Sequence, residues 1–63
     1  MTPEEYRERA AAMLRDTYTD AGVYLWLTRP NKLLGGERAT DLIERGEGER
    51  VLAIIEAIET GGL

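Results

Sequence analysis

The sequence predicts an all-α domain, a small bundle of about four helices, on two observations. Apolar side chains recur with helical spacing near both ends of the chain. Only one segment, Val23 to Leu27, has a strand-like composition, and no second segment of that kind is present to pair with it. An unpaired strand would leave its backbone N–H and C=O groups without partners, so the helical interpretation is favoured. A chain of 63 residues has room for a single domain, residues 1–63.

The first helix has a clear start. Thr2 can cap it, Pro3 fits the first helical position, and Glu5 can complete a capping box. The apolar residues that follow lie on one face, which we expect to pack in the core: Tyr6, Ala10, Met13 and Leu14. The helix is predicted to continue to about Thr17, within an N-terminal unit of residues 1–19.

The second helix is predicted to begin at Thr19 and Asp20, which can cap it. The run from Ala21 to Leu27 is so apolar that we expect this helix to be the buried centre of the domain. Tyr24 and Trp26 are therefore assigned to the core. For Trp26, a place in an interface with another protein is the alternative, because tryptophan is frequent among residues that dominate binding.

A turn separates the two halves of the chain. Pro30 ends the second helix and Asn31 continues the turn. Leu34 is expected in a short helical turn beneath the core, which Gly35 and the glycine after it end. These glycines do not predict a phosphate-binding loop, because no strand precedes them.

The last two helices are predicted over residues 38–45, with Leu42 and Ile43 facing inward and Gly46 ending the helix, and over residues 47–60. The apolar positions of the final helix cover an arc of roughly 160°, wider than the ~100° stripe that seals one helix onto one core. We therefore expect part of this arc to contact another chain. The predicted partner-binding residues are Val51, Leu52, Ile55, Ile58, Glu59, Thr60, Gly61, Gly62 and Leu63.

Composition argues against several classes of function. The chain has no cysteine and no histidine, so an ordinary zinc site and the usual nucleophiles and bases are missing, and we predict no enzyme, no cofactor and no metal. We also expect no room for a cavity of several hundred cubic ångströms. A net charge of −4 without a basic stripe argues against direct binding to nucleic acid. No apolar run approaches the ~20 residues of a membrane span, and the polar start is unlike a signal peptide, so we expect a cytoplasmic protein with no membrane contact.

From Tyr24 onward, the residues resemble the toxin-binding domain of the Xre/MbcA/ParS antitoxin family. The similar pattern is a tryptophan-containing helix, a proline–asparagine turn, a leucine and glycine, a short helix, and a glycine- and glutamate-rich entry to a final apolar helix. It is carried by Trp26–Gly36, Asp41–Ile43 and Gly46–Leu52, within a family-like region of residues 20–63. One departure is Ala39-Thr40, where the family usually has a threonine–proline start to the short helix.

The resemblance implies binding to a cognate RES-domain toxin, an enzyme that consumes or transfers from NAD. It also implies that the last helix and tail cover the toxin's active site. Members commonly carry an N-terminal helix-turn-helix domain, for which residues 1–19 are too few, so we expect a standalone toxin-binding domain. The alternative is a homodimerisation module that does not inhibit a toxin. A dimer is compatible with both interpretations.

Overall fold

A computed structural model describes residues 1–61 of the chain. Within this range there are four α-helices, a short 3-10 helix and a two-stranded antiparallel sheet, so the all-α prediction of about four helices is confirmed. The elements in chain order are α1 (Pro3–Leu14), α2 (Asp20–Thr28), β1 (Pro30–Asn31), η1 (Lys32–Leu34), β2 (Glu37–Arg38), α3 (Ala39–Glu44) and α4 (Gly48–Glu59).

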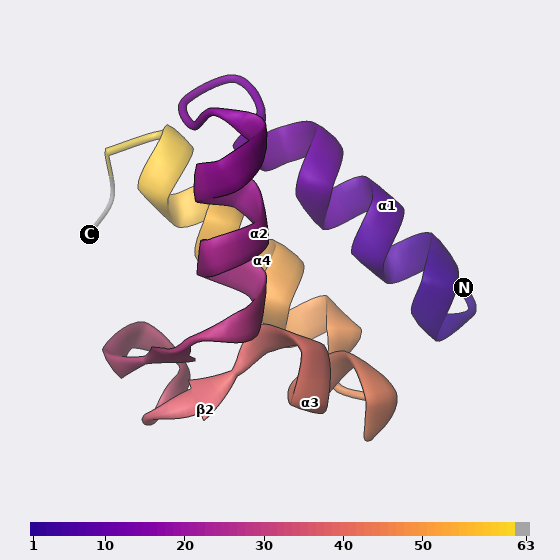
Figure 1. Cartoon of the computed structure of the whole chain (residues 1–63). Helices are drawn as coiled ribbons and strands as arrows, with labels where there is room; N and C mark the ends of the chain where they lie inside the picture. The colour runs from indigo at the N-terminus through magenta and orange to yellow at the C-terminus, as the bar shows by residue number, and fades with distance from the viewer. Residues whose placement is uncertain (62–63) are drawn as a thin grey trace.

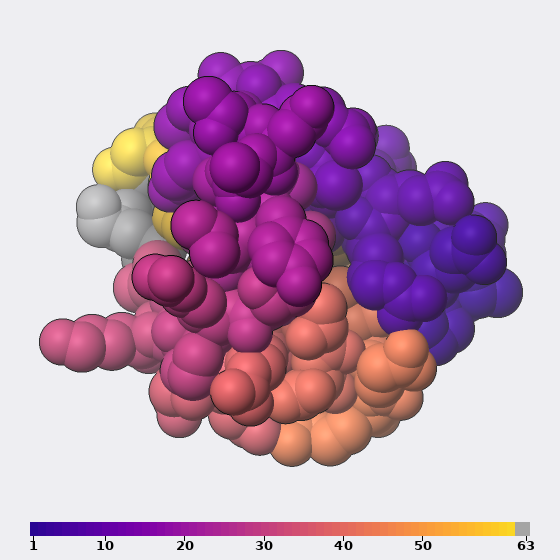
Figure 2. Space-filling model, viewed as in Figure 1, coloured from indigo at the N-terminus to yellow at the C-terminus, as the bar shows by residue number. Residues whose placement is uncertain are grey.

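Helices α1 and α3 pack against α4, the last helix, whereas α2 packs mainly against α1 and α3. In Figure 1, α2 crosses in front of α4, α1 lies to the right, and α3 and β2 lie below. The main packing of α4 is against α1 and α3, and η1 also touches it. The space-filling view shows that α2 forms the front of the molecule (Figure 2).

The N-terminus of α1 is capped as predicted. The Thr2 hydroxyl accepts a hydrogen bond from the backbone N–H of Glu5 at 3.2 Å, and the Glu5 carboxylate accepts one from the backbone N–H of Thr2 at 2.7 Å. The helix ends at Leu14, before the predicted Thr17. The N–H groups of Asp16 and Thr17 bond three residues back rather than four, which tightens the chain into a turn.

The predicted burial of α2 is only partly correct. Thr19 caps the helix and Arg29, before Pro30, is already extended, as expected. Val23 and Leu27 are buried, but Tyr24 is 67% exposed and Leu25 is 41% exposed. Assigning Tyr24 to the core was therefore wrong, because α2 lies at the surface and has only one face to bury in so small a domain. Trp26 is half-buried and packs against the core, as predicted.

The turn after α2 contains a small sheet that sequence analysis did not predict. Pro30 pairs with Arg38, and Asn31 pairs with Glu37. Between these strands, the Asn31 side chain accepts a hydrogen bond from the backbone N–H of Leu33 and so starts η1. Gly35 ends η1 at a φ of 69°, in the left-handed region where a glycine is favoured, and this confirms its predicted role.

The core is entirely apolar among the residues that the model describes. Its members come from every helix: Ala10, Leu14, Val23, Leu27, Leu34, Ala39, Leu42, Ile43, Val51 and Ile55. The predictions that Leu34, Leu42 and Ile43 are buried are thus confirmed. None of the described helices is long and apolar enough to pass through a membrane.

Ion pairs join the small sheet to the start of α4. Both terminal guanidinium nitrogens of Arg45 donate hydrogen bonds to the Glu37 carboxylate, at 2.6 and 2.8 Å, and Arg45 also contacts Glu47 at 3.0 Å. The hydrogen bonds that Glu37 accepts from Arg45 lower the pKa of Glu37. The hydrogen bonds that Arg45 donates to Glu37, and secondly to Glu47, raise the pKa of Arg45.

This contact predicts a pH dependence of stability. Because the folded pKa of Glu37 lies below its ordinary value, its contribution is present above the unfolded pKa and is lost as the pH falls through the folded pKa. Replacing Glu37→Gln should therefore lower the melting temperature at pH 7, and the difference from wild type should vanish in acid. Thermal melts from pH 7 to about pH 2 measure this. Asp16→Asn, at an exposed carboxylate, is the control, and an unchanged difference at every pH would contradict the expectation.

Candidate partner-binding surface

The buried stripe of α4 includes two residues that were predicted to bind a partner. Val51 and Ile55 are both 0% exposed, so they belong to the core of the domain itself. Their assignment to a partner-binding surface was therefore wrong. They lie one helical turn apart on the face that α1, α3 and η1 cover. The sequence showed how wide the apolar arc of α4 is, but it did not show which of its residues the domain itself buries.

The edges of this stripe stay partly exposed. Leu52 and Ile54 flank the buried line on opposite sides and pack against the core with part of each side chain. Ile58 continues the line of Val51 and Ile55 toward the C-terminus and is also only half-buried. The expectation that α4 carries more apolar surface than the domain covers therefore applies to these edge residues. Ile54 was missing from the predicted set, although its spacing from Ile58 places both on one side of the helix.

The helix leads into an exposed end. Glu59, Thr60 and Gly61 are all exposed, and Gly61 has a φ of 72°. Thr60 makes only local hydrogen bonds, including one from its hydroxyl to the Ala57 carbonyl at 3.2 Å. Gly62 and Leu63, which were also predicted to bind the partner, lie outside the described residues. A binding role for this segment stays a prediction.

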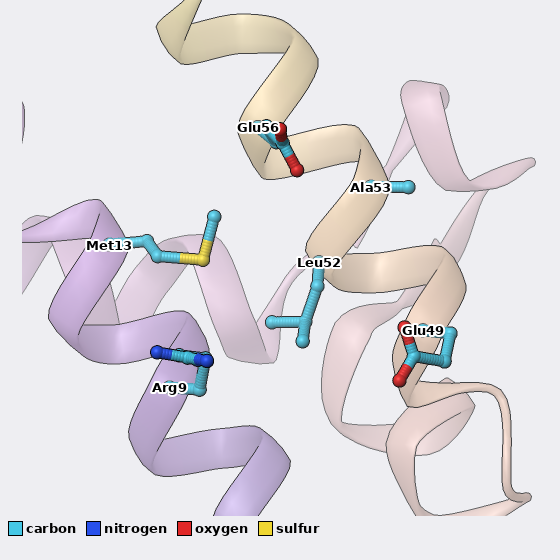
Figure 3. A pocket seen from close by; sticks show the side chains of 6 residues that line it. All are labelled: Arg9, Met13, Glu49, Leu52, Ala53 and Glu56. Atoms are coloured by element: carbon cyan, nitrogen blue, oxygen red, sulfur yellow. The ribbon is translucent and has the colours of Figure 1, made fainter.

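A groove of about 390 Å³ lies between α1 and α4, which come from opposite ends of the chain. The expectation of no space of that size was wrong, although this groove is open to solvent rather than enclosed. Figure 3 shows Met13 and Leu52 pointing toward each other across the space between the two helices. The lining residues are Arg9, Met13, Glu49, Leu52, Ala53 and Glu56.

One end of the groove is fixed by close packing of Tyr6 on the start of α4. The Tyr6 hydroxyl donates a hydrogen bond to Glu49 Oε1 at 2.8 Å, and this bond, more than burial, raises the pKa of Tyr6. The Tyr6 ring lies directly against Gly48, where a Cβ atom would overlap it. A glycine is therefore needed at residue 48 to let α1 approach α4.

The charged groups that line this groove, Arg9, Glu49 and Glu56, are exposed. In the part of the chain that the model covers, no three His, Cys, Asp or Glu side chains gather closely enough to hold a metal ion, and no polar side chain is buried. The site thus consists of half-buried apolar side chains, an open groove and exposed charges. Interfaces with other proteins commonly combine apolar side chains with a polar, solvent-accessible rim, so this arrangement is compatible with binding another polypeptide.

Comparison with known proteins identifies the class. Residues 9–61 match the model of the antitoxin Xre/MbcA/ParS C-terminal toxin-binding domain. The chain belongs to this family, and the predicted resemblance is confirmed. The match begins within α1, earlier than residue 20, where the family-like region was placed. Membership makes this a toxin-binding domain of the antitoxin class and indicates a role other than catalysis.

The similar curated proteins are mycobacterial. The chain is 43% identical over 37 residues to the mycobacterial cidal antitoxin MbcA of Mycobacterium bovis (strain ATCC BAA-935 / AF2122/97), and equally to that of Mycobacterium tuberculosis (strain ATCC 25618 / H37Rv). The aligned region covers 59% of this chain and 33% of either relative, so the chain spans about a third of the length of the curated proteins it matches. No solved structure matches the chain significantly.

Proposed function

We propose that this chain binds a RES-domain toxin that consumes NAD and inhibits it by covering its active site with the end of α4 and the residues that follow. One observation carries the proposal. The last helix keeps Leu52, Ile54 and Ile58 partly exposed and then leads directly into the exposed segment Glu59–Gly61. Membership of the toxin-binding domain family supplies the class of partner.

The physical basis is burial of the apolar edges of α4. Each half-buried side chain has surface left to remove from water, at about 25 cal/mol per Å² of apolar area. An amphipathic helix that lays such a face into a groove of its partner is a common mode of recognition. Because the packed core already holds α4 in place through Val51 and Ile55, little ordering cost remains when the partner binds.

Charge favours the same encounter. The chain has a net charge of −4, and Glu59 is exposed at the end of α4. A pocket that accepts the phosphates of NAD presents positive groups, so an acidic helix end is attracted to it. Such complementarity mainly accelerates association.

Deleting residues 60–63 tests the proposal. The truncated chain should fold normally, because α4 ends at Glu59 and the core residues all precede it. It should lose most of its inhibition of the cognate RES toxin, measured as NAD consumption. A matched variant replaces residues 60–63 with a glycine–serine segment of equal length. It shows whether inhibition needs the side chains of these residues or only the presence of a chain segment in the active site. Full inhibition by the truncated chain would exclude a blocking role for this segment.

A further inference from the structure

We propose that the groove between α1 and α4 seats an amphipathic helix of the partner that carries lysine or arginine residues two turns apart, with apolar residues between them. The inference rests on the proposed function, because the partner that supplies this helix is the toxin. It assigns a second contact, distinct from the end of α4, and it states the chemistry of the segment that fits there.

The α4 wall of the groove has a regular pattern. Glu49 and Glu56 are seven residues apart, with Leu52 and Ala53 between them. Residues at i, i+3, i+4 and i+7 share one face of a helix, and two turns place the two acidic positions about 10.5 Å apart along the axis. This wall therefore presents an acidic, an apolar and a second acidic position in line. A helix laid alongside presents side chains with the same repeat.

The floor of the groove is apolar and adaptable. Met13 on α1 and Leu52 on α4 point into the space from opposite sides (Figure 3), and both also pack against the core. Methionine is unbranched and polarizable, so it can adjust to partner side chains of different shape. An open groove of about 390 Å³ accommodates the side chains on one face of a helix while the helix itself lies above.

Among residues 1–61, the charged groups of the groove form no ion pairs, although the Glu49 carboxylate accepts the hydrogen bond from the Tyr6 hydroxyl. By contrast, ion pairs are formed by Arg7, Arg15, Arg38, Arg45 and Arg50. The two carboxylates lie on the α4 wall, and the Arg9 guanidinium lies on the α1 wall. A partner helix fits with its cations along α4 and a neutral or acidic edge along α1. This polarity fixes which edge of the helix faces each wall, and the carboxylates disfavour an anionic ligand such as nucleic acid.

A charge reversal tests the contact on the intact chain. Glu56→Lys should weaken the affinity for the cognate RES toxin roughly tenfold or more without changing the melting temperature, because Glu56 makes no side-chain hydrogen bond or ion pair within residues 1–61. The control is Glu8→Lys, the same change at an exposed position on the outer face of α1, which should bind within about twofold of wild type. Calorimetry measures both. Wild-type affinity of the Glu56→Lys variant would overturn the inference, whereas failure of the wild-type chain itself to bind the toxin would overturn the proposed function instead.

A peptide probe tests the groove without the toxin. A helical peptide with lysines at i and i+7 and leucines at i+3 and i+4 should shift the amide resonances of Met13, Leu52 and Ala53. It should also bind at least about tenfold more tightly than the same peptide with glutamates in place of the lysines. Equal binding of the two peptides, or shifts confined to α2, would contradict the inference. A dimer of the free chain that Glu56→Lys dissociates would also contradict it, since a second copy would then occupy the groove.

Discussion

The substitution Ile55→Ala should lower the free energy of unfolding by about 2–5 kcal/mol. Ile55 is completely buried at the centre of the α4 stripe, so the lost side chain leaves a cavity that its neighbours in α1 and α3 fill only partly. A domain of this size has a total stability of only a few kcal/mol. The variant should therefore be substantially unfolded at 37 °C and should fail to bind the toxin for that reason.

Ile58→Ala is the matched control, since it makes the same change three residues later at a half-buried position. Urea denaturation should give it a much smaller loss of stability, under about 1.5 kcal/mol, because less surface is buried there. Its toxin affinity should nevertheless fall while it remains folded. Equal losses of stability in the two variants would mean that the division between the core and the exposed edge of α4 is misplaced.

Gly48→Ala should destabilise the domain by about 1–3 kcal/mol, the usual range for overpacking. In most helices this change is favourable by up to about 1 kcal/mol, since alanine forms helix better than glycine. Here the added Cβ overlaps the Tyr6 ring, so Tyr6 must move away and its hydrogen bond to Glu49 is lost with the contact. Chemical denaturation of purified protein measures the effect.

A double mutant shows whether the overlap with Tyr6, rather than some other effect of a side chain at residue 48, causes the loss of stability. In a Tyr6→Ala background the ring is absent, and Gly48→Ala should change sign and become neutral or stabilising. A loss of the same size in both backgrounds would show that Tyr6 is not the reason for the glycine.

Most of the helical framework could be predicted because its signals are local. The Thr2 and Thr19 caps, the stop at Pro30 and the left-handed glycines are each decided by a few neighbouring residues. The β1–β2 pair escaped prediction because strands of two residues leave no periodicity to detect.

The candidate surface was harder to predict because it depends on how the helices pack. The wide arc of α4 indicated excess apolar surface, but only the arrangement of α1, α3 and η1 decides that Val51 is covered and Leu52 is not. Tyr24 was assigned to the core on composition, although its side of α2 faces solvent. The groove joins Arg9 and Met13 to residues about forty positions later, and no local pattern links them.

The most direct test of the proposed inhibition is a titration of purified cognate RES toxin with the folded chain, following NAD loss. We predict that NAD consumption stops when one chain is present for each toxin active site. If the toxin still consumes NAD at its full rate with the folded chain in molar excess, then α4 and the residues after it do not block the active site.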